Sequence, residues 1–428
     1  MTKISNQPYK GCRDFLPDDY AKQKYIFDKW RSVAISYGYQ EYLTPVIEHI
    51  EMYEAKSGED INKELFRFED SGGRKLCLRP EMTPSVTRLV SQVYNSSPKP
   101  LRLFSIANFF RGERPQKGRL REFWQLNVDI FGENSILADI EILRLAIDVL
   151  RVFNPPKKSF YIKLNHRVLM EDFFEKVLEI LDPKLKTEIS RKLDKFHKLS
   201  TDDFNAELAN LGLSTSQIEN INKWMNYKYN DILDDPVLSD SKGVKEINEI
   251  FSYLDNTEYA DYLVYSPDLI RGFDYYDGIV FEAFDNNPDF KRSLFGGGRY
   301  NGLGKIFGVE DLPAVGFAPG DVSIDIFLTN WNLWPNFQDN EDIYYFPLLI
   351  NEINRFFNIS KNLRLKELNI IEGLKKETLT KALSYANKMN YKKVVIVGED
   401  EIGKNIAKIK YMDSGREEII ELADLNTV

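Results

Sequence analysis

Apolar residues recur at two different periods along the first 155 residues of the chain. From 20 to 37 they keep helical spacing, with Ile26, Trp30, Val33 and Ala34 on one face. Four short runs are instead alternating or continuously apolar, which predicts strands. These runs are 39–47, 76–78, 101–106 and 124–131, and helical spacing returns over 137–152. The proline within the first run predicts the edge of a sheet or an end of pairing.

Helical spacing continues through the middle of the chain, from 166 to 258. The segments are 168–181, 184–199, 202–211, 215–226 and 243–254, separated by Pro183, Gly212 and the cluster Asp234-Asp235-Pro236. Strand signals are scarce here, so we expect a helical insertion. Strand-like sequence resumes at 261–284 and 292–298.

The last part of the chain alternates again after a tract of turn-forming residues, 329–340, that predicts a linker. We expect strands at 343–350 and 393–398, the second buried on both faces because it is continuously apolar. An amphipathic helix is expected at 378–389. The runs 406–411 and 418–422 flank Asp413-Ser-Gly415, which predicts a hairpin. Residues 341–428 are therefore expected to form a small α/β domain.

The composition is that of an ordinary folded protein. Of 428 residues, 43% are hydrophobic and 29% are charged, and the length suggests two to four domains. The net charge of −9 argues mildly against a nucleic-acid binder, although a local basic patch would decide binding. The two cysteines, Cys12 and Cys77, are too few for a disulfide framework. No signal peptide or membrane-spanning run is visible, so we expect a cytoplasmic protein without membrane contact.

One strongly basic stretch stands out against this acidic background. Between Arg111 and Arg121, five basic residues face one acidic residue, Glu113, which gives a net charge of +4 (five minus one). The stretch lies between two predicted strands and contains Pro115 and Gly118, so we expect a long hairpin loop. Such basic runs are more often solvated loops than sites. A focused cationic loop of arginines nevertheless suits a polyphosphate, because guanidinium groups match phosphate oxygens in pairs.

Three further stretches carry candidate binding residues. In Leu78-Arg-Pro-Glu-Met-Thr-Pro84, Thr83 is expected to cap a helix, and Glu81 and Thr83 could receive an ammonium group. The second stretch is Ile270-Arg-Gly-Phe-Asp-Tyr-Tyr276. The third, Gly296-Gly-Gly-Arg-Tyr300, lacks the glycine order of a dinucleotide fingerprint. The histidines His49, His166 and His197 are scattered, and we expect them to be structural or on the surface.

In their order and spacing these stretches resemble the histidyl-tRNA synthetase family, which belongs to the class II aminoacyl-tRNA synthetases. Residues 110–125 resemble motif 2 in its histidine-specific form, and 270–282 resemble the family's histidine-specific signature. Further similarity lies in 11–17, in 37–45 (motif 1) and in 313–320 (the start of motif 3). The helical insertion also falls where the family has one.

The resemblance implies a set of site residues. Arg111 and Arg271 would be catalytic, because both would place a cation at the α-phosphate of ATP. The histidine substrate would contact Glu81, Thr83, Gln125, Asp129, Tyr275, Tyr276 and Tyr300. ATP would contact Arg111, Glu113, Arg119, Phe123, Arg271 and Gly298, with Phe123 stacked on adenine. The tRNA acceptor end would contact Gln116 and Arg121.

The resemblance also implies an α+β fold, with an antiparallel sheet flanked by helices as catalytic core. Its two parts would be 1–165 and 259–328, interrupted by the insertion at 166–258. The linker 329–340 would lead to an anticodon-binding domain at 341–428, of class IIa type. L-Histidine, ATP and histidine tRNA are the expected partners, Mg²⁺ is an expected cofactor, and a homodimer is expected.

The sequence departs from the family pattern at one place. Motif 3 usually continues as Gly-x-Glu-Arg, and its arginine contacts the γ-phosphate, whereas this chain has Gly320-Asp-Val-Ser323. No lysine or arginine occurs between Lys305 and Arg355, so a shifted register cannot supply the cation. Another arginine or Mg²⁺ would have to compensate for the lost phosphate contact.

Two functions are therefore open from the sequence. The first is a histidine–tRNA ligase that forms histidyl-adenylate and charges tRNA. The second is a related protein without this activity, such as the histidine-sensing regulatory subunit of ATP phosphoribosyltransferase. That relative normally lacks the anticodon domain and degrades the histidine-type motifs. Because this chain keeps both features, the sequence favours the ligase.

Overall fold

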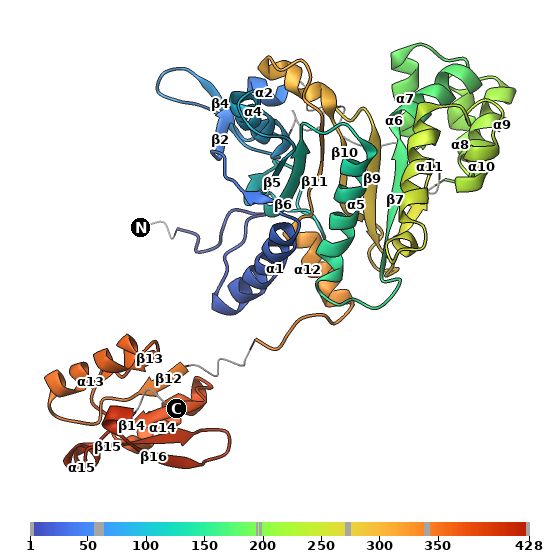
Figure 1. Cartoon of the computed structure of the whole chain (residues 1–428). Coiled ribbons are helices and arrows are strands. Elements are labelled where there is room, and N and C mark those ends of the chain that lie inside the picture. The colour runs from blue at the N-terminus through green and yellow to red at the C-terminus, as the bar shows by residue number, and fades with distance from the viewer. Residues whose placement is uncertain are drawn as a thin grey trace. The chain divides into compact units, whose positions relative to one another are not determined.

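The computed structural model describes residues 4–54, 64–193, 196, 199–269, 275–337 and 343–424. The chain divides into two compact units, Met1–Trp334 and Pro335–Val428 (Figure 1). Among the described residues, no helix is long and apolar enough to cross a membrane.

An eight-stranded sheet forms the centre of the first unit, in the order β1-β5-β6-β11-β10-β9-β7-β8. The strands are β1 (Gln40–Glu41), β5 (Leu101–Phe110), β6 (Glu122–Phe131), β11 (Ala314–Phe317), β10 (Ser293–Arg299), β9 (Ile279–Asp285), β7 (Phe160–His166) and β8 (Leu263–Tyr265). The six central strands pair antiparallel, and only the two outermost pairings are parallel. The expected antiparallel α+β core is therefore confirmed.

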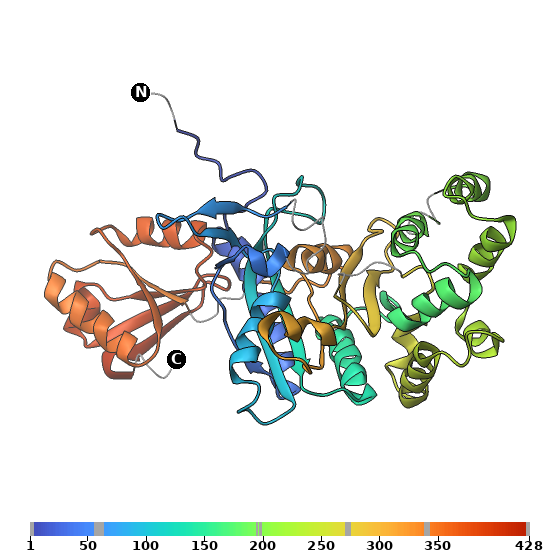
Figure 2. The ribbon, with the colours of Figure 1, turned by 90° about the horizontal axis from the view of Figure 1, so that it is seen from above.

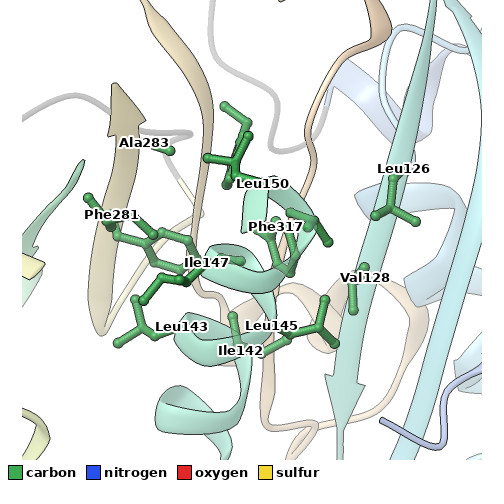
Figure 3. Close-up of a cluster of buried hydrophobic side chains, with 14 of the residues drawn as sticks. Leu126, Val128, Ile142, Leu143, Leu145, Ile147, Leu150, Phe281, Ala283 and Phe317 are labelled. Carbon is green, nitrogen blue, oxygen red and sulfur yellow. The ribbon is translucent and has the colours of Figure 1, made fainter. Parts of the chain in front are cut away.

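Three helices pack on one face of this sheet: α1 (Pro17–Ser36), α5 (Ile136–Arg151) and α12 (Asp321–Asn330). Figure 3 shows Leu143, Ile147 and Leu150 of α5 among apolar side chains of β6, β9 and β11. In β6, Leu126 and Val128 belong to this buried core. Because side chains alternate along a strand, the residues between them point to the other face of the sheet. That second face carries the site described below.

The strand expected at 39–47 is instead two short strands in different sheets. After β1 the chain passes Pro45 and enters β2 (Ile47–His49). This strand belongs to a three-stranded sheet, β2-β4-β3, with β3 (Arg67–Glu69) and β4 (Lys75–Leu78). Helices α2 (Glu51–Glu54) and α4 (Thr83–Val93) flank it in the chain. The single-strand prediction was wrong, while the expected position at the edge of a sheet is confirmed for β1.

The helical segments between 167 and 254 have a hydrophobic core of their own. They are α6 (Arg167–Asp172), a π-helical turn (Phe173–Val177), α7 (Pro183–Leu193), α8 (Thr201–Ala209), α9 (Thr215–Trp224), α10 (Tyr229–Asp234) and α11 (Lys242–Leu254). Figure 2 shows these green helices gathered beyond the end of the sheet, where α6 and α11 contact β7. The sequence pattern missed α10, which is short, and β7, which borders the helical region.

The second unit is a five-stranded sheet in the order β13-β12-β14-β15-β16. Its elements are β12 (Ile343–Phe346), α13 (Ile353–Leu365), β13 (Asn369–Glu372), α14 (Leu379–Lys388), β14 (Lys393–Ile396), α15 (Glu399–Gly403), β15 (Ile406–Tyr411) and β16 (Glu417–Glu421). Val394 and Val395 are fully buried, as expected for a strand covered on both faces. The expected hairpin around Gly415 is formed by β15 and β16.

Candidate active site

A pocket of about 630 Å³ lies on the sheet face that points away from α5. Its walls come from the corner between β4 and α4, the β5–β6 hairpin, strands β9, β10 and β11, and the start of α12. Ten of the site residues predicted from the sequence line it: Glu81, Thr83, Arg111, Glu113, Arg119, Phe123, Gln125, Asp129, Tyr276 and Tyr300. Segments as far apart in the sequence as Glu64 and Ser323 thus share one cavity.

A buried carboxylate marks one end of the pocket. The Tyr300 hydroxyl donates a hydrogen bond of 2.5 Å to Asp129 Oδ1. Burial raises the pKa of Asp129 to about 7, although the Tyr300 hydrogen bond acts in the opposite direction. Gly316 lies beside this carboxylate, and any side chain there would collide with Asp129. This end of the pocket therefore presents a buried carboxylate whose near side must remain free of side chains at Gly316.

A second buried carboxylate, Glu81, lies in the turn before α4. It is only 3% exposed, and its Oε2 accepts a hydrogen bond of 2.8 Å from the Tyr275 hydroxyl. The Tyr53 hydroxyl donates to the Glu81 backbone oxygen at 3.2 Å. The helix begins at Thr83, and its N-cap is Met82, so the expected capping by Thr83 was wrong by one position. Thr83 therefore occupies the first turn of α4, and it lines the pocket.

The cationic end of the pocket is formed by the β5–β6 hairpin, which confirms the predicted loop between two strands. Arg111 Nε donates to the Pro80 backbone oxygen at 3.0 Å. Its guanidinium carbon lies 5.1 Å from the centre of the Phe123 ring. The guanidinium therefore lies over the Phe123 ring in a cation–π contact. Arg119 forms an ion pair of 3.1 Å with Glu113 on the same loop.

Four predicted residues lie in the described structure but do not line the pocket. Tyr275 is buried behind Glu81, and Gly298 lies against the Tyr276 ring, where a side chain would displace it. Gln116 is in the loop turn and pairs with Arg119 through the backbone. Arg121 donates to the backbone oxygens of Glu113 and Lys10.

Two predicted residues lie outside the described part of the chain. They are Arg271, with its neighbours 270–274, and His197. The other two histidines are away from the pocket, as expected. His49 is exposed. His166 is buried, caps α6 by accepting from the Val168 amide, and lies 2.7 Å from Glu246 Oε2.

An aspartate occupies the start of α12, in the segment that departs from motif 3. Asp321 is 3% exposed, and Arg13 Nη2 lies 2.6 Å from its Oδ2. Its other oxygen accepts from the Trp124 backbone amide at 2.9 Å. Ser323, at the position of the family's arginine, donates to the Leu294 backbone oxygen at 2.6 Å. This corner therefore ties the N-terminal segment to the sheet, and its arginine, Arg13, is already paired with Asp321.

Sequence reasoning missed two residues that shape the site. Asn127 lines the pocket between Gln125 and Asp129, and its side-chain nitrogen has no hydrogen-bond partner among the described residues. The alternation of β6 was a signal that could have found it. Arg79 is 3% exposed and donates to the backbone oxygens of Thr44 and Asn108. No sequence pattern distinguishes such a buried structural arginine from a ligand-binding one.

A large antiparallel sheet, a cationic hairpin and two buried carboxylates in one pocket define a class of protein. This is the catalytic core of a class II aminoacyl-tRNA synthetase, in which charge and positioning replace a nucleophilic side chain.

Comparisons with known proteins identify the family. The family model for histidyl-tRNA synthetase matches residues 11–320, and an anticodon binding domain model matches residues 354–428. A histidine–tRNA ligase of Leptospira biflexa is 39% identical over 96% of this chain and 94% of its own length. One from Pyrococcus horikoshii is 35% identical over 97% of this chain and 96% of its own length. The chain belongs to the histidyl-tRNA synthetase family.

The fold agrees with this assignment. The crystal structure of histidyl-tRNA synthetase from Nostoc sp. PCC 7120 superposes with a TM-score of 0.81 at 23% identity. The match covers 99% of both chains, so the similarity of the fold extends over both units.

Proposed function

We propose that this chain joins histidine to its tRNA in the pocket described above, with Asp129 and Tyr300 at the imidazole end and Arg111 at the phosphate end. Histidine–tRNA ligase activity itself follows from full-length relatives at 35–39% identity. The observation that carries the residue assignment is the pocket, because it brings together ten residues expected from the resemblance.

Glu81 supports the first part of the mechanism, which is the orientation of histidine. Its buried carboxylate, held by the Tyr275 hydroxyl, is placed to receive the α-ammonium group together with Thr83 and Gln125. Asp129 would accept the imidazole N–H and so fix the ring's tautomer. Asp129 already accepts a hydrogen bond from Tyr300, but a wrong amino acid would fail to supply the second donor, the imidazole N–H, which is a basis for discrimination. Tyr276 would form a further wall of the imidazole site.

The chemical step is an in-line displacement at phosphorus. A carboxylate oxygen of histidine attacks the α-phosphorus of ATP, the bond to the β-phosphate oxygen breaks, and pyrophosphate leaves. Arg111, held by the Pro80 oxygen and the Phe123 ring, would stabilise the charge that develops at the α-phosphate. Phe123 would stack on adenine, and Glu113, Arg119 and the backbone at Gly298 would complete the nucleotide site.

Transfer to tRNA is the second step, in which a hydroxyl of the terminal ribose takes the histidyl group from the adenylate and AMP leaves. The β5–β6 loop is a suitable acceptor-end contact, because Gln116 and Arg121 lie on it outside the pocket. The second unit, which the anticodon binding domain model matches, would bind the anticodon. We place the domain limits at 1–165, 166–258, 259–328, 329–340 and 341–428. The reaction's substrates suit a cytoplasmic location.

Mg²⁺ is expected to accompany ATP. Among the described residues no group of three or more His, Cys, Asp or Glu side chains could hold a metal ion. Mg²⁺ at nucleotides needs only one or two carboxylates besides phosphate oxygens, so this does not conflict with the expectation. Glu113 and Glu282 line the pocket and are the candidate ligands; the ion would neutralise phosphate charge.

A homodimer is a further proposal, supported by apolar exposure around motif 1. Leu16, Tyr20, Ile35, Leu43 and Ile47 are between 49% and 72% exposed, and all lie on or near α1 and the segment after it. A monomer rarely leaves several large apolar side chains this exposed in one stretch of chain. Contact with a second copy would cover them.

Histidine-dependent exchange of pyrophosphate into ATP tests the proposed function. Purified protein is expected to catalyse exchange only when histidine is present, and then to charge histidine tRNA. A regulatory protein would bind histidine without exchange. Folded protein that binds both ATP and histidine but shows no exchange would refute the ligase proposal in favour of that alternative.

Arg271 is tested by the substitution Arg271→Ala. We expect adenylation to fall by at least a hundredfold with the fold intact, because a fixed cation at the α-phosphate would be lost. Single-turnover formation of histidyl-adenylate is the measurement, with circular dichroism as the check on folding. Near-normal turnover in this variant would overturn the role assigned to Arg271.

The pH dependence of histidine use tests Asp129. Its pKa of about 7 means that the carboxylate is ionised above pH 7 and protonated below it. Only the ionised form can accept an N–H on both oxygens, so kcat/KM for histidine should fall as the pH drops below 7. Free histidine also protonates, near pH ~6.5. The logarithmic slope below pH 6 should therefore approach two.

The variant Asp129→Asn separates the two ionisations. It keeps the size of the side chain but does not titrate, so its lower activity should follow a slope of one, which belongs to histidine alone. The kcat/KM for ATP at saturating histidine serves as the internal control. Equal slopes in wild type and Asp129→Asn would exclude Asp129 as the group that titrates.

A further inference from the structure

The triphosphate of ATP meets few available cations in this pocket. Arg111 and Arg119 are the two arginines among its described lining residues, and Arg119 is already paired with Glu113 at 3.1 Å. The start of α12 adds a buried aspartate, Asp321, and a serine whose hydroxyl is bound to backbone oxygens. A ligand with about four negative charges at neutral pH needs more positive charge than this at its outer phosphates.

The β9–β10 hairpin brings one further arginine to the same side of the pocket. Arg292 directly precedes Ser293 and Leu294, which both line the pocket. Leu294 is also the residue whose backbone oxygen accepts from Ser323 at 2.6 Å. Arg292 is therefore two residues before Leu294, which contacts Ser323, the residue at the position of the motif 3 arginine. Figure 1 shows β9 and β10 as neighbouring strands of the sheet.

Two contacts hold this hairpin against the cationic loop. Arg292 Nη2 donates to Gln116 Oε1 at 2.9 Å. Phe290 is 5% exposed, and its ring lies so close to Gly118 that a side chain there would touch it at 3.2 Å. The exposed guanidinium of Arg292 thus contacts the loop turn at Gln116, close in the chain to Gly118 and Arg119, which line the pocket.

The partner of Arg292 suits an exchange for phosphate. Within the described residues, its guanidinium forms no ion pair, and the Gln116 oxygen that it contacts is neutral. A guanidinium can bind two phosphate oxygens at once and adds charge attraction that a neutral amide oxygen does not provide. Phosphate could therefore replace the Gln116 amide at Arg292 without breaking an ion pair. Arg119, by contrast, would first have to leave its ion pair with Glu113.

We propose that Arg292 binds the β- and γ-phosphates of ATP, and the departing pyrophosphate, in place of the arginine that motif 3 lacks. When the bond between the α-phosphorus and the β-phosphate oxygen breaks, the electron pair stays on pyrophosphate, and Arg292 stabilises that charge. This inference rests on the proposed ligase function for its chemistry but not for its binding test.

Calorimetric titration of ATP and of AMP, each alone, tests the proposal on the full chain. For Arg292→Ala we expect the Kd of ATP to rise about tenfold or more, and the Kd of AMP to stay within twofold of wild type. AMP lacks the outer phosphates but uses Arg111 and Phe123. A loop that had merely moved would therefore weaken both ligands equally, which would overturn the proposal, as would unchanged ATP affinity.

Two variants complete the test. Lys291→Ala removes the same charge one residue away on the exposed turn. It should leave both Kd values unchanged. An equal loss of ATP affinity in Lys291→Ala would show that only the overall positive charge matters, which would refute the role of Arg292. Arg292→Lys should recover part of the ATP affinity.

Pyrophosphate exchange by wild type separates this inference from the proposed function. If the wild-type protein does not exchange pyrophosphate into ATP, the proposed ligase function is refuted. The difference between the ATP and AMP affinities would still show whether Arg292 binds the outer phosphates.

Discussion

Replacing Arg111 by alanine is expected to lower histidine-dependent pyrophosphate exchange by about a thousandfold while the protein stays folded. Its guanidinium is held in advance by the Pro80 backbone oxygen and the Phe123 ring, so it needs no rearrangement to meet charge at the α-phosphate. Removal of one such preorganised donor typically costs ~10²–10³ in rate. A full cation at a reacting phosphate belongs at the upper end of that range.

Arg121→Ala is the matched control for this prediction. Arg121 belongs to the same basic loop, but its side chain is bound to the backbone oxygens of Glu113 and Lys10. We expect exchange to stay within a few-fold of wild type and tRNA charging to fall about tenfold. Pyrophosphate exchange and charging are measured on both variants. Similar exchange defects in the two would show that the loop acts through its overall charge, contrary to the assigned role of Arg111.

Glu81→Gln is expected to reduce kcat/KM for histidine several-hundred-fold. The carboxylate is almost fully buried, so the α-ammonium group would lose its charged partner in a place that water does not replace. Loss of one partner in such a buried charge pair costs ~2–5 kcal/mol. The effect should appear in histidine kinetics, while KM for ATP changes little. Steady-state exchange at varied histidine and varied ATP gives both values.

Tyr275→Phe is the companion to this variant. It removes the hydroxyl that donates to Glu81 at 2.8 Å but leaves the ring and the carboxylate in place. Because this change removes a group that orients the carboxylate but leaves its charge, we expect kcat/KM for histidine to decrease by about tenfold. If Tyr275→Phe were as damaging as Glu81→Gln, the carboxylate would act mainly as a structural anchor and not as the ammonium partner.

Elements with a strong local pattern could be predicted from the sequence. Helices α1 and α5 and the β5–β6 hairpin lie within a few residues of their expected limits. The short elements α10 and β7 were missed, and so were the longer helices α12 and α13, so element length alone does not explain which patterns were recognised. The strand expected at 39–47 is two strands, because its pairing with β5 ends near Tyr42, before Pro45, and the chain continues in a second sheet.

By itself, the sequence determined the family, the order of the motifs and the chemical types in the site. Asp129, Arg111 and Glu81 can be identified because the residues around each of them also match the family's sequence pattern. The absence of the motif 3 arginine was also visible in the sequence, because comparison with the family motif shows which residue type a position lacks.

Only the tertiary structure decided which groups meet. The sheet joins Asp129 to Tyr300 across 171 residues, and burial then raises the carboxylate's pKa to about 7. Asp321 contacts Arg13, 308 residues away in the sequence. The β9–β10 hairpin likewise brings Arg292 to Gln116 of the cationic loop, which lies 176 residues earlier in the chain. Long-range contacts and desolvation depend on strand pairing between distant segments, which no local pattern of residues encodes.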